Sequence, residues 1–180
     1  MSSEPCSTPR ETALRTPYTT LGREHADAAI DSLSHLDPAT SLLVIPCSAT
    51  KTCGGTAQRG LGLCDVLPKA QADRLRKARQ AVHDRAGIDE SHLMPAWQRY
   101  SGTFFAAASG DLGHAIANGA NIAILSGGYG AVLATEPIGM YDARFKLTWW
   151  PGDVVGDSIA EYARVRGLGT IIAFLAASTD

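Results

Sequence analysis

A thiol, a hydroxyl and an amine lie close together in the segment Ile45–Thr52, where they are supplied by Cys47, Ser48 and Lys51. A thiolate attacks electrophilic carbon, and a nearby ammonium group or helix N-terminus favours the thiolate over the thiol. Cys47 is therefore a candidate nucleophile, with Lys51 as its activating group and Ser48 as a neighbouring hydrogen-bond donor. The alternative is structural, because free cysteine often serves as a small buried hydrophobe. Both interpretations stay open on sequence grounds.

The glycine-rich run Ser126–Gly130 is the second candidate. Gly127, Gly128 and Gly130 would let backbone N–H groups approach an anion or a base edge, and Tyr129 offers a ring face and a hydroxyl. A tight turn that needs glycine to leave a strand explains such a run equally well. On its own, the run does not separate a ligand loop from a turn.

A carboxylate, Glu136, follows the glycine run and is itself followed by Tyr141 and Asp142. Glu136 could act in the same pocket as a general acid, a general base or an anchor for a ribose hydroxyl. Alternatively, it is an exposed acidic residue in the first turn of a helix, where negative charge is favoured. Tyr141 and Asp142 are assigned to the same substrate-binding site.

Tyr100 and Ser101 precede a stretch with helical character. Ser101 is expected to cap this helix, whose free N–H groups would bind an anion. Tyr100 would either stack on a base or pack in the core with Phe104 and Phe105, as aromatic clusters commonly do.

A metal site built from Cys47, Cys53 and Cys64 is rejected, because the five and ten intervening residues match no common zinc or iron–sulfur pattern. No cofactor is expected. Residues 1–20 are rich in Ser, Thr and Pro and lack the basic and apolar regions of a secretory signal. We therefore expect a cytoplasmic protein with reduced thiols.

The elements that would position these residues alternate between strands and helices. Apolar runs predict strands over Ser41–Ile45, Asn121–Leu125 and Thr170–Ala176, and helical spacing predicts helices over Glu24–Leu36, Lys69–Ala86, Ser101–Ala117 and Asp153–Arg166. The alternation predicts an α/β fold with a mostly parallel central sheet flanked by helices. Ligands bind at the carboxyl ends of such strands, so Cys47–Ser48 and Ser126–Gly130 are expected to share one pocket.

The chain of 180 residues, with 45% hydrophobic residues and a formal charge of −2, has the composition of one soluble domain. We expect a flexible leader over residues 1–22 and a single domain over residues 23–180. No apolar run approaches the ~20 residues that a membrane span needs. The last apolar strand is followed directly by Ser178–Asp180, where a covering helix is usual, so a C-terminal truncation is expected.

The predicted helix that begins at Lys69 carries six Lys or Arg residues up to Arg85, against Asp73 and Asp84. Such a stripe could follow a phosphate backbone. It contains no aromatic residues to stack on bases, and a solvated surface is its commoner role.

Three separated blocks resemble the YaaA peroxide-stress family and its smaller relatives: Ile45–Thr52, Pro95–Phe105 and Leu125–Asp142. The blocks occur in the family's order, within the span from Leu42 to Phe145. The third block is the most specific, because its residues fall in a register similar to that of the family: Ser126, Tyr129, Gly130, Glu136, Pro137, Ile138 and Tyr141.

The resemblance implies a YaaA-like α/β fold with a cleft between these loops, in a family linked to peroxide stress and DNA binding. The unit Pro46-Cys47-xxx-Lys51 is also similar to a motif of archaeosine synthase, which modifies a deazaguanine base in tRNA. This chain is shorter than the larger YaaA proteins, is slightly acidic and has no evident helix-hairpin-helix segment. Carried over by motif, the residues around the pocket are Cys47, Ser48, Lys51, Tyr100, Ser126, Tyr129, Glu136 and Tyr141.

The leading functional hypothesis is an enzyme that acts on a nucleobase, nucleoside or nucleotide as its small-molecule partner. It would either cleave an N-glycosidic bond through Glu136 or modify the base through Cys47 and Lys51. A non-enzymatic DNA-binding protein of the peroxide-stress response is the alternative, with the helix Lys69–Ala86 against phosphates. A catalytically silent binding module is the third hypothesis.

Overall fold

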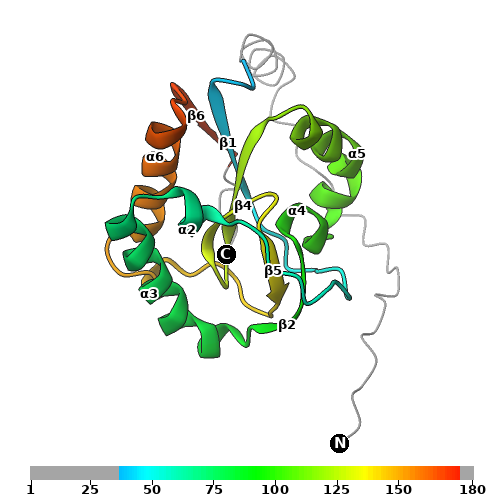
Figure 1. The fold of residues 1–180 in the computed structure, drawn as a ribbon. Coiled ribbons are helices and arrows are strands. Elements are labelled where there is room, and N and C mark those ends of the chain that lie inside the picture. Colours follow the sequence, from blue (N-terminus) through cyan, green and yellow to red (C-terminus); the bar gives the residue numbers. More distant parts are fainter. Residues whose placement is uncertain (1–36, 175–180) are drawn as a thin grey trace, which may run out of the picture. The chain divides into compact units, whose positions relative to one another are not determined.

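The structure is a computed structural model that describes residues 37–174. The predicted leader, residues 1–22, and the predicted helix Glu24–Leu36 lie outside the described residues. The elements follow in the order β1 (Ser41–Pro46), α2 (Leu63–Val66), α3 (Lys69–Ala86), β2 (Asp89–Pro95), α4 (Ala96–Arg99), α5 (Thr103–Ala117), β3 (Asn121–Ser126), β4 (Gly130–Leu133), β5 (Pro137–Met140), the 3₁₀ helix η1 (Leu147–Trp149), α6 (Val154–Arg166) and β6 (Thr170–Ala173) (Figure 1).

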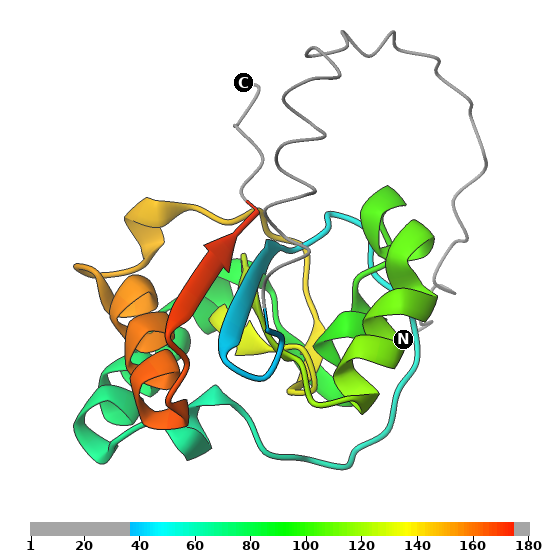
Figure 2. The same ribbon diagram turned by 90° about the horizontal axis from the view of Figure 1, so that it is seen from above.

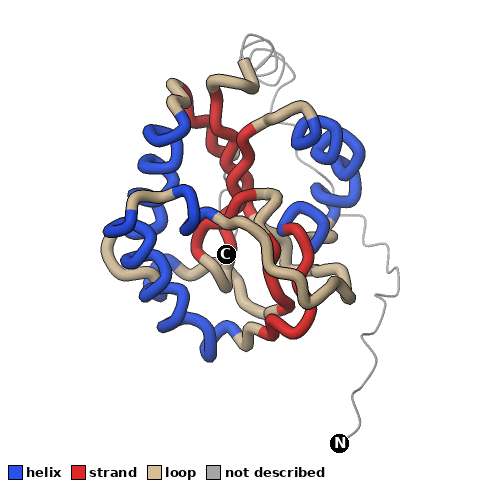
Figure 3. Tube along the Cα trace, viewed as in Figure 1, coloured by secondary structure: helices blue, strands red, loops and turns tan. Residues whose placement is uncertain are grey.

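The main sheet has four strands in the order β4-β3-β1-β6. β1 runs parallel to both β3 and β6, and β4 returns antiparallel to β3. Figure 3 shows these strands in red between blue helices. The expected α/β class with a mostly parallel sheet is therefore confirmed for this part of the chain.

Helices cover both faces of this sheet. Figures 1 and 2 show α3 and α6 on one face and α5 on the other, with the strands between them. α3 has the predicted bounds, and its buried residues recur at helical spacing: Ala72, Leu75, Ala78, Val82 and Ala86. They pack in the same core as the strand residues Leu42 and Ile124, which are both 0% exposed. Each fully buried side chain of this kind stabilises the fold by roughly 1.5–3 kcal/mol relative to an exposed one.

A second, two-stranded antiparallel sheet joins β2 to β5. The sequence does not predict this second sheet. Leu93 is the one fully buried residue of β2, and the remaining residues of the strand are mostly polar. The four-residue helices α2 and α4 are likewise shorter than any period that an apolar pattern can reveal. These elements close around the loop that follows β1.

Residues 52–62 form no helix or strand, although Thr56 makes an isolated bridge to Leu93. The expected Ser101 cap is wrong. The N-cap of α5 is Gly102, which has no side chain to cap with, and Ser101 is exposed. Thr170–Ala173 is a strand, whereas Ala176, the predicted end of that strand, lies outside the described residues. Within residues 37–174, no helix has both the length and the apolar character of a membrane span.

Candidate functional site

The ends of β1 and β3 bring two of the predicted site segments side by side. Pro46 pairs with Leu125, and the Cys47 N–H continues the ladder by donating to the Leu125 carbonyl at 2.9 Å. β1 lies between β3 and β6 in the sheet. After β1, the chain first forms β3 on one side of it and later forms β6 on the other side. The carboxyl end of β1 is thus a topological switch point, which is where ligands bind in open α/β sheets.

Three buried hydroxyl groups form a closed triangle beside this strand end. The Tyr100 hydroxyl donates to Ser126 Oγ at 3.0 Å and lies 2.7 Å from the Tyr141 hydroxyl, which is itself 3.0 Å from Ser126 Oγ. The Tyr129 N–H also donates to Ser126 Oγ, at 3.1 Å. Burial raises the pKa of both Tyr100 and Tyr141, so these hydroxyls stay protonated near neutral pH.

Lys51 lies against the Tyr141 side of this triangle. Its Nζ is 4.1 Å from the centroid of the Tyr141 ring and 6.0 Å from that of Tyr100. The same Nζ donates to the carbonyls of Ser48, at 3.4 Å, and Ala49, at 3.2 Å. Partial burial lowers the pKa of Lys51, while the charges of Cys47 and Asp142 oppose that shift. An amine in this setting gives up a proton more readily than an exposed lysine does.

Cys47 is a half-buried free cysteine at the centre of these contacts. Burial is the largest cause of the raised pKa of Tyr141, and the neighbouring Cys47 adds to it; the charge of Cys47 also acts on Lys51. A hydroxyl donor and a cation both stabilise a thiolate. A nucleophilic role for Cys47 stays a prediction.

Ser48 has a local role in shaping the turn. Its Oγ accepts from the Thr50 N–H at 3.1 Å and lies 3.1 Å from Thr50 Oγ1. A Cβ atom at Gly102 would come within 2.2 Å of the same oxygen, so a larger residue where α5 begins would displace the Ser48 side chain. Asp142 is exposed and affects Lys51 through its charge.

Arg99, which sequence reasoning missed, fixes the loop that carries Lys51. It is 0% exposed, and its guanidinium donates to the carbonyls of Thr52, at 2.6 Å, and His92, at 2.7 Å. The backbone adds an isolated bridge between Lys51 and Tyr100. Burial lowers the pKa of Arg99, and no ion pair involves it among residues 37–174. A buried arginine is a rare residue that no local pattern could have indicated.

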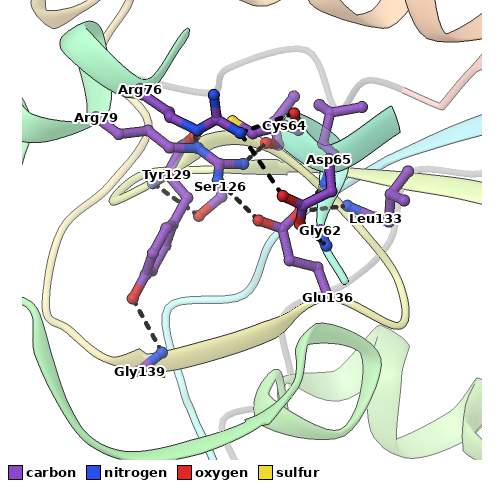
Figure 4. A network of polar contacts seen from close by, with 12 residues as sticks. Gly62, Cys64, Asp65, Arg76, Arg79, Ser126, Tyr129, Leu133, Glu136 and Gly139 are labelled. Carbon is purple, nitrogen blue, oxygen red and sulfur yellow. Dashed lines mark hydrogen bonds and ion pairs between the residues drawn. The ribbon is translucent and has the colours of Figure 1, made fainter. Parts of the chain in front are cut away.

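Glu136 belongs to a different set of contacts from Cys47 and Lys51. Its Oε1 accepts from Arg79 at 2.7 Å, and its Oε2 accepts from the amides of Leu63, at 2.8 Å, and Leu133, at 3.1 Å. Figure 4 shows Arg79 and Glu136 facing each other. Burial opposes the charge of Arg79, but the charge and hydrogen bond of Glu136, together with the charges of Cys64 and Tyr129, outweigh it, so the pKa of Arg79 is raised. The alternative of an exposed carboxylate at a helix start is wrong, since Glu136 is 6% exposed and precedes β5.

The glycine run is buried and packed rather than open. A Cβ atom at Gly127 would lie 2.2 Å from the Ala143 carbonyl oxygen, and one at Gly128 would lie 3.0 Å from the Tyr141 ring. A Cβ atom at Gly130, whose φ is +76°, would lie 2.9 Å from the Trp150 ring. These contacts favour the tight-turn interpretation of Ser126–Gly130.

The tyrosine rings also pack against the protein. Tyr100 is 2% exposed, with Phe105 at 5.3 Å and Tyr141 at 6.5 Å between ring centroids. The prediction that a base stacks on Tyr100 conflicts with this packing. Tyr129 lies 5.9 Å from Tyr141, and its hydroxyl donates to Glu90 and accepts from the Gly139 N–H.

The cysteines depart from the expectation of wholly reduced thiols, because Cys53 is disulfide-bonded. Cys47 and Cys64 are free. Within residues 37–174, no three His, Cys, Asp or Glu side chains gather in a way that could hold a metal ion.

The basic residues of α3 are largely paired with carboxylates. Lys69 contacts Asp73, and Arg74 contacts Asp157. Arg76 contacts both Asp65 and Asp73, while Arg79 is held by Glu136. The stripe expected to follow a phosphate backbone is therefore mostly neutralised.

The comparisons with known proteins leave the YaaA resemblance as a prediction. No protein-family model, no curated protein and no solved structure matches this chain.

Proposed function

We propose that this chain is an enzyme that modifies a nucleobase, either free or within a nucleoside or nucleotide, through Cys47 and Lys51. The observation that carries the proposal is the half-buried Cys47 thiol, which has the Tyr141 hydroxyl and the Lys51 amine as neighbours at the switch point of the sheet. The substrate class rests on the similarity of Pro46-Cys47-xxx-Lys51 to the motif of archaeosine synthase.

In the proposed step, the Cys47 thiolate adds to an electrophilic carbon of the base, such as a ring carbon or a nitrile carbon. A carbon–sulfur bond forms as the π electron pair moves to the attached nitrogen, which takes a proton from the Lys51 ammonium group. An amine or water as second substrate then attacks the same carbon, the neutral Lys51 amine takes the proton that this nucleophile loses, and the carbon–sulfur bond breaks to release the Cys47 thiolate. The hydrogen bonds among Tyr100, Ser126 and Tyr141 fix the position of the Tyr141 hydroxyl.

Base modification is favoured over bond cleavage through Glu136. The Glu136 carboxylate already accepts hydrogen bonds from Arg79 and from two backbone amides, which commits both of its oxygens. Both oxygens would have to give up a protein partner before either could act on a substrate. The DNA-binding alternative of the peroxide-stress response has no comparable support, since the α3 cations are largely paired.

The test combines a thermal-shift screen with turnover measurements. Purified protein is mixed with nucleobases, nucleosides and nucleotides, including deazaguanine nitriles, with ammonium as the amine donor, and products are followed by mass spectrometry. We expect one class to stabilise the protein and to be converted. Cys47→Ala and Lys51→Met should abolish conversion, while Cys64→Ala and the exposed Lys77→Met serve as matched controls.

Two results would overturn the proposal. The first is an absence of stabilisation by every nucleobase, nucleoside and nucleotide tested. The second is conversion that survives in a folded Cys47→Ala variant, as judged by circular dichroism.

A further inference from the structure

A cavity of ≈ 520 Å³ lies between α3, the segment around residues 59–65 and the second sheet. This volume is within the range of about 300–1,000 Å³ that is usual for small-molecule sites. Cys47, Lys51, Tyr100, Ser126 and Tyr141 are not among the residues that line it. The cavity is therefore separate from the reaction site proposed above, and an inference about it does not depend on that reaction.

One wall of the cavity is a polar face of α3. Arg76, Arg79, Gln80 and His83 line it, and their spacing of three, four and seven residues places them on the same side of the helix. Arg79 is fixed at the base of this wall, because it donates to the carbonyls of Tyr129 and Ala131 as well as to Glu136. Figure 4 shows Arg76 and Arg79 next to each other above Glu136.

Two of the lining arginines have exposed carboxylate partners. Arg59 contacts Glu90 at 3.1 Å with 80% of its side chain exposed. Arg76, with 51% exposed, contacts Asp65 at 3.6 Å and Asp73 at 3.3 Å and donates to the Cys64 carbonyl at 3.1 Å. Exposed ion pairs contribute little to stability. A phosphate group offers both guanidinium groups a stronger, bidentate partner than these carboxylates.

The remaining lining residues suit the rest of a sugar phosphate. Glu90 and Asp65 would be released from their arginines and could accept hydrogen bonds from hydroxyl groups. Ile88, Leu93 and Pro137 provide an apolar surface for a carbon skeleton. Three arginines face three carboxylates here, which suits a ligand with both an anionic group and hydroxyl donors better than a bare anion.

We propose that this cavity binds the sugar phosphate group of a small metabolite, with the phosphate held by Arg59 and Arg76 and the hydroxyls held by Glu90 and Asp65. A free sugar phosphate and a mononucleotide both carry this group. The two sources are distinguished by experiment.

The experiment measures the binding of ribose 5-phosphate, adenosine monophosphate, adenosine and inorganic phosphate to the full chain by calorimetry. We expect ribose 5-phosphate to bind, and Arg76→Gln or Arg59→Gln to weaken it by about tenfold or more, as expected for a lost charged hydrogen bond. Tighter binding of adenosine monophosphate would identify a nucleotide, and equal or weaker binding would identify a sugar phosphate as the source.

The matched control is Arg74→Gln, which removes an arginine from the same helix that pairs with Asp157 and does not line the cavity. It should leave the affinity unchanged, as should Cys47→Ala, which acts only on the proposed reaction. The proposal is overturned if neither phosphate ester binds, or if the affinities of the Arg76→Gln and Arg74→Gln variants are equal. It also fails if adenosine or inorganic phosphate alone binds as tightly as the esters.

Discussion

Cys47 and Cys64 are both free thiols, but their surroundings differ in ways that govern reactivity. Cys47 is half-buried, with the Tyr141 hydroxyl and the Lys51 amine as neighbours. Cys64 is 8% exposed, and burial raises its pKa, which disfavours its thiolate. The thiolate is the form that reacts with alkylating agents, so the two cysteines should be alkylated at different rates.

We predict that iodoacetamide at neutral pH alkylates Cys47 faster than Cys64, and that Lys51→Met slows the reaction at Cys47 without affecting Cys64. Peptide mapping by mass spectrometry under non-reducing conditions gives both rates in one sample. Lys77→Met is the control for the loss of a lysine charge. Equal rates at the two cysteines in the folded protein would contradict this account.

The parallel pairing of β1 and β3 explains which site residues were predictable. Two apolar runs that each end in polar residues suffice to place Cys47 near Ser126, because parallel strands end at the same edge. The partner of Glu136 was not predictable, since Arg79 lies 57 residues away and looks like one more solvated residue of a basic helix. The burial of Arg99 was not predictable for the same reason, because its partner Thr52 is also distant in the sequence.

At the scale of elements, the Glu136–Arg79 pair joins α2, α3 and the segment between β4 and β5. Both side chains are largely buried, with exposed fractions of 8% and 16%. Removing one partner leaves the other charge buried and uncompensated. We predict that Glu136→Gln lowers the free energy of unfolding by about 3–5 kcal/mol, as for other buried pairs.

Urea denaturation followed by circular dichroism measures this loss. The control is Glu161→Gln, which removes a carboxylate from the exposed pair with Arg164 and should change stability little. Similar effects of the two variants would mean that Glu136 does not hold these elements together.

The turn between β3 and β4 gives a second prediction about elements. Gly127→Ala would place a methyl group 2.2 Å from the Ala143 carbonyl oxygen, so the backbone must shift and stability must fall. Gly156→Ala in α6 is the matched control, because a Cβ atom there meets nothing within 4 Å. In a helix this change should stabilise by roughly 0.5–1 kcal/mol. Thermal unfolding of both variants tests the contrast, and a neutral Gly127→Ala would refute the close packing.

The long elements were predictable because their periods repeat. α3 has the bounds that its apolar stripe indicates, and α6 begins one residue after the predicted start at Asp153. β2 and β5 were missed because their pairing is non-local and neither carries an alternating apolar pattern. The structure of these two strands depends on the contact between them, and a single sequence does not reveal that contact.

For the molecule as a whole, buried tyrosines set its response to alkaline pH. Burial raises the pKa of Tyr100, Tyr129 and Tyr141. Above the usual tyrosine pKa, the unfolded chain therefore releases protons that the folded chain retains, and stability falls as pH rises. We predict that the melting temperature declines steeply above about pH 10, the usual tyrosine pKa.

Absorbance at about 295 nm follows tyrosinate formation and should show the ionisation of these residues coinciding with unfolding. Tyr141→Phe should reduce the alkaline decline, because it removes one of the protons that the folded state retains. Full tyrosine ionisation at the usual pKa with the fold intact would show that these hydroxyls are not buried.

The Arg99 guanidinium has a consequence for the order in which the protein assembles. Its acceptors at Thr52 and Ile138 lie 47 and 39 residues away along the chain. Contacts over such separations form only after most of the chain has closed, and they raise the contact order that slows folding. The loop bearing Lys51 gains this anchor only when these distant segments have come together. The proposed reactivity of Cys47 would therefore be acquired only as the chain completes its fold.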